Sequence, residues 1–465
     1  MPSKSTETAA SQHQPITPYH RHASFSLDPP SKLSGMLKYW GPGLILTASV
    51  VGSGELIATT GLGAKVGYLA LWLIIISCVI KVALQLVIGR YAISSGETTL
   101  QIFDSLPGPR FRVSWTVWLW LVMTIMTSFQ LGAMLGGVGM VLNILMPQFS
   151  ITMWALVIAG ITVLLLVGGR YTSIEKISIA MVAAFTLTTI ICVVLIQQTP
   201  YHYTIADLIS GLKFELPSGG VAIALAVFGI TGIGSSEIIY YPYWCLEKGY
   251  ARAVGLPENS EIWYSRARGW IRTMNWDAFL SMIIYTVLTL AFYILGAAVL
   301  HSQGLVPEGM EMIKILSQMY TDVLGVGAFY LFLAGAFFAL FSTMFVSVAA
   351  IARLTTDCFQ LMDIAKIKSS ADWRKWVRWL IILQPPLHFL LFAFFKTPLW
   401  MVIVGGTAQT LMLPIIVFAA MYLRYRKFDI KLMPSKFLDV LLWGSSIAIL
   451  AVAVYGLLAR FGISF

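Results

Sequence analysis

Charged residues are scarce in this chain. Only 11% of its 465 residues are Asp, Glu, Lys or Arg and 58% are hydrophobic, whereas about a quarter of a soluble protein is charged. Apolar runs close to the roughly 20 residues that cross a bilayer recur from about Tyr39 to the C-terminus. The shortage of charge excludes a soluble domain for most of the chain and predicts an all-α membrane protein.

Motifs for catalysis and for structural metal sites are also missing. The chain has no GKS/T nucleotide-binding loop and no HExxH or GxSxG motif. Its four cysteines are far apart and form neither a CxxC pair nor a Cys/His pattern. We therefore expect no enzyme activity, no ATP-driven pump and no cofactor. The cysteines, which we interpret as small core residues, are Cys78, Cys192, Cys245 and Cys358.

The first 34 residues differ in composition from the remainder. Met1–Ser34 is rich in Ser, Thr, Pro and His, and it lacks the apolar core of a signal peptide. We expect residues 1–34 to be a disordered cytosolic tail. Residues 35–465 are expected to form a single transmembrane domain.

Hydropathy predicts about eleven transmembrane helices in that domain. The predicted spans are Tyr39–Ala64, Tyr68–Ile93, Val113–Leu145, Ile151–Val167, Ile174–Ile196, Gly219–Leu246, Trp276–Leu300, Gly325–Cys358, Trp376–Phe395, Leu399–Tyr422 and Phe437–Ala459. The long connection Glu247–Arg272 has aromatic residues and spaced arginines, which are typical of an amphipathic segment on the lipid surface. At the start of the seventh span, Asp277 is interpreted as a helix N-terminal charge.

The distribution of Lys and Arg fixes the expected orientation. If alternate loops are assigned to alternate sides, 25 of the 31 Lys and Arg fall on one side and five on the other, and Lys81 lies inside a span. Cytosolic loops carry such an excess of cations. The net charge of +10 therefore reports topology and does not indicate nucleic-acid binding. We predict a plasma-membrane protein with a cytosolic N-terminus and an external C-terminus.

The first and sixth spans share a motif at their centres. The first reads Val-Gly-Ser-Gly-Glu-Leu-Ile over Val51–Ile57, and the sixth reads Ile-Gly-Ser-Ser-Glu-Ile-Ile over Ile233–Ile239. Five helix steps separate the two spans, so the motifs cross the membrane in opposite directions. This pattern predicts an inverted repeat of five plus five helices, over about residues 39–196 and 219–422, with an accessory helix at about 437–459.

The glycines and serines of these motifs are expected to break both helices. Broken backbone is tolerated at membrane depth only where it lines a cavity or is buried in protein, and paired breaks mark the substrate site of a transporter. The alternative interpretation is a packing face of small residues without a break. The predicted site residues are Gly52, Ser53, Gly54, Glu55, Gly234, Ser235, Ser236 and Glu237.

Two glutamates at the centre of a membrane need a positive partner. Each ionised carboxylate costs at least about 2.5–3.5 kcal/mol there, and the pair would also repel each other. A bound cation satisfies both Glu55 and Glu237, and surroundings of oxygen atoms alone favour Mg²⁺, Mn²⁺ or Ca²⁺. The glutamates could instead carry protons, or one could pair with Lys81, which we interpret as an internal counter-ion.

Six short motifs lie between residues 38 and 425, namely Gly41-Pro42-Gly43, Gly61-Leu62-Gly63-Ala64, Gly89-Arg90-Tyr91, Ser95-Gly96-Glu97-Thr98, Leu142-Asn143 and Leu413-Pro414. Together they resemble the Nramp divalent-metal transporters over most of this range. The resemblance implies the LeuT-type fold of the amino acid-polyamine-organocation superfamily. It also implies that the tenth helix faces the site, which adds Gln409 to the candidate residues.

The chain departs from the family pattern at the site itself. Nramp proteins have Asp-Pro-Gly-Asn in the first helix, where this chain has Gly52 to Glu55, and Met-Pro-His in the sixth, where it has Gly234 to Ser236. Acidic residues of the third helix are replaced near Leu131 and Met134, so proton coupling is not expected by the family route. The pattern is more similar to Nramp-related magnesium transporters than to true Nramp proteins.

The sequence therefore predicts a transporter that moves divalent metal cations by alternating access, with Mg²⁺ favoured and Mn²⁺ next. Glu55 and Glu237 are the predicted metal ligands, and the lipid bilayer is the expected surrounding. The rival hypothesis is a transporter of an amino acid, a cationic amino acid or a polyamine on the same fold. The sequence leaves the oligomeric state open.

Overall fold

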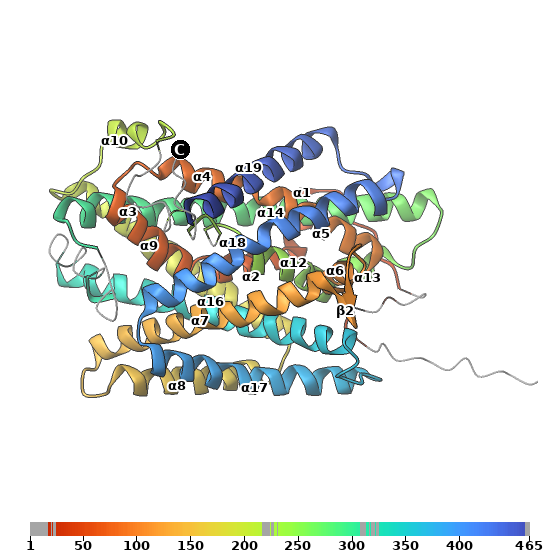
Figure 1. Ribbon diagram of the computed structural model, residues 1–465, viewed down its shortest axis with the longest axis horizontal. Helices are drawn as coiled ribbons and strands as arrows, with labels where there is room; N and C mark the ends of the chain where they lie inside the picture. Colours follow the sequence, from red (N-terminus) through yellow and green to blue (C-terminus); the bar gives the residue numbers. More distant parts are fainter. Residues whose placement is uncertain are drawn as a thin grey trace, which may run out of the picture.

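The computed structural model describes residues 17–19, 21, 25–215, 224, 227–229, 231–306, 313–315, 317, 321 and 325–460, without the side chains of residues 53 and 456–460. Most of these residues are helical, and the helices run along the long axis of the molecule (Figure 1). In this part of the chain the only strands are β1 (Arg110–Phe111) and β2 (Val113–Ser114), a short antiparallel pair.

Among the described residues, nine helical spans are long and apolar enough to cross a membrane. They are Pro42–Val66 (α2, Pro42–Val50; η2, Ser53–Thr59; α3, Thr60–Val66), Leu71–Ser95 (α4, Leu71–Ile80; α5, Val82–Ser95), Trp115–Leu145 (α7), Tyr171–Gln198 (α9, Tyr171–Leu195; η3, Ile196–Gln198), Glu261–Gln303 (α14, Glu261–Leu295; η4, Gly296–Leu300; η5, His301–Gln303), Val326–Leu361 (α16), Ser370–Phe395 (α17), Pro398–Lys427 (α18, Pro398–Tyr422; η7, Leu423–Lys427) and Lys436–Tyr455 (within α19, Lys436–Arg460).

Two further segments complete the set that the sequence predicts. The shorter apolar helix α8 (Ile151–Leu166) matches the predicted fourth span. The sixth span is represented by its second half, α12 (Ser235–Lys248), and most of its first half lies outside the described residues. The remaining short helices are α1 (Leu33–Met36), η1 (Leu37–Tyr39), α6 (Thr99–Asp104), α10 (Ile205–Ser210), α13 (Tyr250–Val254) and η8 (Ile430–Leu432).

Local sequence explains where several helices begin and end. The hydroxyls of Ser150 and Ser260 accept hydrogen bonds from the first turns of α8 and α14, which is the usual role of an N-cap serine. Proline at Pro42 and Pro398 occupies the first position of α2 and α18, where no amide hydrogen is needed. Gly96 and Gly249 end α5 and α12 with positive φ angles, a conformation that glycine adopts without strain.

The seventh span differs from the prediction. The sequence predicts a helix from Trp276 preceded by a segment on the lipid surface, but α14 is continuous from Glu261. Trp263 and Trp270 in its first turns are buried. The aromatic residues of this segment pack inward against the protein, so it extends the helix.

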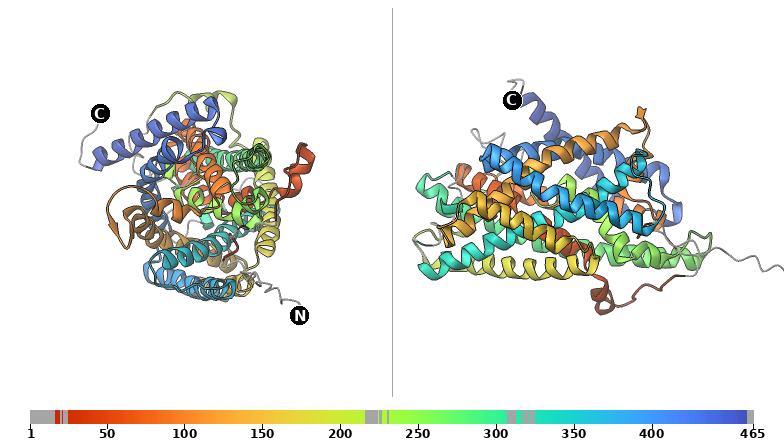
Figure 2. Two further views of the ribbon diagram at one scale, coloured as in Figure 1. Left: turned by 90° about the vertical axis from the view of Figure 1, so that its right-hand side faces the viewer. Right: turned by 90° about the horizontal axis from the view of Figure 1, so that it is seen from below.

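The helices form layers around the two broken spans. α8 and α17 pack side by side along one face, and α7 and α16 lie next to them (Figure 1). α2, α12 and α5 pack together with α14 on the other side. The end-on view in Figure 2 shows the red-orange and green segments of the broken helices near the centre, surrounded by the other helices.

Candidate functional site

The first helix breaks between α2 and η2. Val51 and Gly52 leave the helical conformation, and the chain becomes helical again at Ser53, whose side chain lies outside the described part. A Cβ atom on Gly52 would overlap the side chain of Thr343 in α16. Glycine is therefore required here because the broken backbone lies directly against α16.

The sixth helix breaks between Thr231 and Gly234, before α12 begins at Ser235. Gly232 has φ +63°, which favours glycine, and a Cβ on it would lie 2.8 Å from the Cα of Cys78 in α4. A Cβ on Gly234 would overlap Oε1 of Gln409 and lie 2.5 Å from Oε2 of Glu237. Both breaks that the sequence predicts are thus present, and each lies in close contact with a neighbouring helix.

Glu55 lies between the two breaks and is fully buried. Its Oε1 accepts hydrogen bonds from the amide of Gly232 and from the hydroxyl of Thr289, each at 3.2 Å. Its Oε2 accepts one from the amide of Gly52 at 3.3 Å. The carboxylate therefore joins the break of the first helix to the break of the sixth, and both of its oxygens have protein donors.

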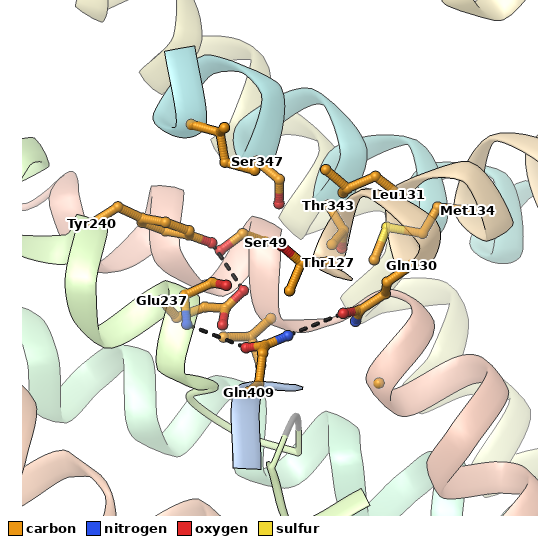
Figure 3. A pocket seen from close by; sticks show the side chains of 14 residues that line it. Ser49, Thr127, Gln130, Leu131, Met134, Glu237, Tyr240, Thr343, Ser347 and Gln409 are labelled. Atoms are coloured by element: carbon orange, nitrogen blue, oxygen red, sulfur yellow. Dashed lines mark hydrogen bonds between the residues drawn. The ribbon is translucent and has the colours of Figure 1, made fainter. Parts of the chain in front are cut away.

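Glu237 lies in the first turn of α12 and faces a small cavity. Its side chain is 8% exposed, and its Oε1 accepts a hydrogen bond from the hydroxyl of Tyr240 at 3.0 Å. Figure 3 shows this carboxylate beside the hydroxyl of Tyr240 and close to Gln409. The structure thus separates the two predicted metal ligands, because the cavity is lined by Glu237 and not by Glu55.

Two glutamine side chains close the cavity opposite Tyr240. Oε1 of Gln409 in α18 accepts from the amide of Ser236 at 3.2 Å, and its Nε2 donates to Oε1 of Gln130 in α7 at 3.0 Å (Figure 3). The hydroxyl of Ser235 donates to the carbonyl of Gln409 at 2.6 Å. This chain of bonds connects the break of the sixth helix to the third and tenth spans.

The cavity measures about 30 Å³, which is room for about two water molecules. Its wall contains a carboxylate, two carboxamides, several hydroxyls and a thioether. The lining residues are Ser49, Val50, Gly54, Thr127, Gln130, Leu131, Met134, Ser236, Glu237, Tyr240, Thr343, Ser347, Ile351 and Gln409.

Gln130 and Met134 are among the lining residues that the sequence did not assign to the site. Both are buried on α7 and separated by one helical turn, so both face the cavity. The predicted site contained no sulfur because neither break carries Met or Cys, but the thioether of Met134 reaches it from another helix. Gln130 is a polar residue in a span without charges, and this feature of the sequence could have identified it as a site residue.

Lys81 completes the polar surroundings. It lies between α4 and α5 and is fully buried. Its Nζ donates to the carbonyls of Phe228 and Thr231, each at 2.6 Å, and Ser77 donates to the same two carbonyls. Lys81 thus binds the carbonyls that precede the sixth-helix break, and Glu55 and Glu237 lie within its electrostatic range.

Asp277 caps a different helix from the one that the sequence suggested. It lies well inside α14 and not at its N-terminus. Its carboxylate accepts hydrogen bonds from the amides of Gly41 at 3.1 Å and Gly43 at 2.6 Å, and from the hydroxyl of Tyr241. Asp277 therefore caps the N-terminus of α2 from a neighbouring helix.

The described residues contain no group of three or more His, Cys, Asp and Glu side chains arranged to hold a metal ion. A metal ion at this site would have to bind one carboxylate together with neutral oxygens and water. Mg²⁺ suits such a site because it usually keeps several waters and uses one or two carboxylates.

The sequence of this chain is similar to those of known membrane transporters. Residues 43–459 match the sequence profile of the Nramp family, described as natural resistance-associated macrophage protein-like. An uncharacterized protein of Pasteurella multocida strain Pm70 is 24% identical over 69% of this chain and 70% of its own length. A metal transporter of Populus trichocarpa, Nramp6.2, is 27% identical over 34% of this chain, and the match spans only 27% of that relative.

Solved structures share the fold. A manganese transporter of Eremococcus coleocola superposes with a TM-score of 0.66 at 15% identity, over 92% of this chain and 88% of that one. The transporter MhsT in complex with L-phenylalanine superposes with a TM-score of 0.57 at 14% identity, over 92% and 99%. The LeuT-type arrangement with broken first and sixth helices is confirmed, and the chain belongs to the Nramp family of membrane transporters.

Proposed function

We propose that this chain transports divalent metal cations across the plasma membrane, with Mg²⁺ favoured and Mn²⁺ next. The observation that carries the proposal is the cavity between the broken helices, where Glu237 supplies a negative charge and Gln130 and Gln409 add carboxamide oxygens. A divalent ion with one water, its other ligands supplied by the wall, fits a space of about 30 Å³. Two relatives support metal transport, because their names call them a metal transporter and a manganese transporter.

The two glutamates have different roles in this proposal. Glu237 binds the ion, directly or through water, because it is the carboxylate on the cavity wall. Glu55 holds the two breaks at the spacing that shapes the cavity, because its oxygens accept from Gly52 and Gly232. Lys81 acts as an internal cation that stabilises the end of the sixth-helix segment and offsets part of the negative charge.

The small volume of the cavity favours the metal over the organic rival. An amino acid or a polyamine is much larger than two waters and does not fit the cavity in this conformation. The thioether of Met134 makes Mn²⁺ a stronger second candidate than the sequence predicted, since sulfur favours transition metals over Mg²⁺.

Transport would follow alternating access of two helix groups. We propose that α2, α5, α12 and α14 move together against α7, α8, α16 and α17, around the site between them. Leu131 and Met134 line the cavity where the Nramp pattern has acidic residues, so the proposal includes no proton coupling at these positions. The membrane potential would drive uptake, at about 4.6 kcal/mol per 100 mV for a divalent ion.

The test is ion uptake into proteoliposomes that contain the purified protein. We expect inward flux of Mg²⁺ and Mn²⁺ that increases with an inside-negative potential, without matching internal acidification. Glu237→Gln should lower the flux at least tenfold, since one charge in a site of low dielectric contributes more than 1.4 kcal/mol. Glu258→Gln, which removes an exposed carboxylate, is the matched control.

Three results would contradict the proposal. Divalent flux that is unchanged in Glu237→Gln would remove that residue from the ion site. Uptake of radiolabelled arginine or ornithine that is indifferent to metals would favour the organic substrate instead. Acidification in step with metal entry would overturn the uncoupled mechanism.

A further inference from the structure

Described residues that precede the first span lie against the end of the bundle where α6 and α13 lie, at the right in Figure 1. We call the described residues Thr17–Tyr19, Arg21 and Phe25–Pro30 the N-terminal strap. Composition predicts a disordered tail here, yet Tyr19 is only 7% exposed. A tyrosine buried to this extent has specific contacts with the rest of the protein.

Tyr19 touches both groups of helices. Its ring meets Tyr243 in α12 edge to face, with centroids 5.5 Å apart, and it meets Trp373 in α17 in the same way at 5.9 Å. α12 continues the broken sixth helix, whereas α17 packs with α7, α8 and α16. One side chain of the strap therefore bridges the two parts that must separate during transport.

Tyr19 also rests on a buried polar network between α12 and α16. Its hydroxyl donates to Oε1 of Glu247 at 3.5 Å, and Glu247 forms a buried ion pair with Arg353 at 2.6 Å. Burial and the charge of Glu247 raise the pKa of Tyr19 well above its usual value, so the phenol remains a donor. In the same network, Asp357 accepts from the hydroxyl of Tyr243 at 2.5 Å.

The other described residues of the strap bind to α5, α13 and α14, on the same side as α12. The guanidinium of Arg21 donates to the carbonyls of Ile93, in α5, and of Gly255, at 3.0 and 3.1 Å. The amide of Leu27 donates to the carbonyl of Ala253 in α13 at 2.9 Å, and the indole of Trp270 in α14 donates to the carbonyl of Leu27 at 2.8 Å. Tyr19 is thus the residue of the strap that also contacts α17, in the other group.

We propose that the N-terminal strap is an autoinhibitory latch that keeps the cytosolic side of the transporter closed. An ion can leave the cavity at this end only if α12 moves away from α16 and α17, and this movement separates Tyr19 from Trp373, because its contacts with Tyr243 and Glu247 lie on α12. The proposal rests on the transport function proposed above. It adds that the resting conformation is stabilised by a segment outside the helix bundle.

The latch can be tested by the accessibility of a cysteine in the cavity wall. Ile351→Cys places a thiol on α16 at the cavity, and the native cysteines, all buried, give a background that is measured without this substitution. The labelling rate with a membrane-impermeant thiol reagent from the cytosolic side reports opening. We compare Tyr19→Ala, Tyr19→Phe and deletion of residues 2–30, with Tyr330→Ala as an exposed control at the other end of α16.

Tyr19→Ala and the deletion should each raise the labelling rate several-fold, because they remove the aromatic contact with Trp373 that joins the two helix groups. Tyr19→Phe should raise it less, since the ring contacts remain. A labelling rate that is unchanged in both Tyr19→Ala and the deletion, with the proteins monodisperse in detergent, overturns the latch. Because labelling requires no ion, a rise in labelling without metal uptake would instead contradict the proposed function.

Discussion

The carboxylate of Glu55 offers a test of how the site is built. Glu55→Gln keeps the size of the side chain but replaces one acceptor oxygen by an amide group. In the native protein three donors face this carboxylate, namely the amides of Gly52 and Gly232 and the hydroxyl of Thr289. The glutamine can accept from Gly232 and Thr289 with its one oxygen, and its NH₂ group then faces the amide of Gly52.

The cost of this change follows from the donor that loses its acceptor. A buried N–H group without a partner lowers the free energy of unfolding by about 1–3 kcal/mol. The bonds from Gly232 and Thr289 also become weaker, because their acceptor is then a neutral oxygen. Gly52 has the longest of the three bonds, at 3.3 Å, so the lower half of this range is expected. We therefore expect Glu55→Gln to lower the Tm of the metal-free protein by a few degrees.

The assay is thermal unfolding in detergent, with a chelator and then with Mg²⁺ or Mn²⁺. Glu237→Gln is the matched comparison, because it changes the carboxylate that faces the cavity. A ligand at 100 times its Kd stabilises the folded state by about 2.7 kcal/mol. Glu55→Gln should keep most of this metal-induced rise in Tm, whereas Glu237→Gln should lose it and should not destabilise the metal-free protein.

The opposite pattern refutes the reasoning. If Glu55→Gln leaves the metal-free Tm unchanged and abolishes the metal-induced rise, Glu55 is a ligand of the ion and its bonds to the two breaks contribute little. If both variants lose the rise, the two glutamates bind the ion together, as the sequence alone suggested.

Three other substitutions probe neighbouring features. Met134→Leu removes the only thioether on the described cavity wall and should lower the ratio of Mn²⁺ to Mg²⁺ uptake several-fold; an unchanged ratio would show that sulfur does not take part in selectivity. Lys81→Met removes the lysine donor from the carbonyls of Phe228 and Thr231, to which Ser77 still donates, and should lower the Tm; if Lys81 serves mainly as a counter-ion, adding Glu237→Gln should restore the Tm in a double-mutant cycle. Asp277→Asn loses one amide bond at the start of α2, about 1–2 kcal/mol, and should speed cytosolic labelling at Ile351→Cys; equal labelling would mean that the cap does not control opening.

Several features could be read from the sequence because they follow from local rules. Long apolar segments need a bilayer, and they predicted roughly the helices that the described residues show, apart from the start of the seventh span. Gly52 and Gly234 marked the breaks correctly, because glycine at the centre of a span weakens the helix and allows close approach of a neighbour. The candidate Gln409 lines the cavity, as the family resemblance implied.

The roles of the buried charges could not be read in this way. At a break the helical period is lost, so the sequence does not show which way Glu55 and Glu237 point. The freed amides of Gly52 and Gly232 take up one carboxylate, which leaves the other for the cavity. The same competition for hydrogen bonds places Lys81 on backbone carbonyls and Asp277 at the start of α2.

The sequence by itself therefore determined that this is a membrane transporter with two broken helices, because hydropathy, charge bias and glycine position are properties of the chain taken locally. Only the tertiary structure decided which groups line the cavity between the broken helices. Gln130 and Met134 come from a span with no motif, and Tyr19 comes from a segment whose composition predicts disorder. Their positions depend on contacts between residues far apart in the chain, and neither composition nor periodicity encodes such contacts.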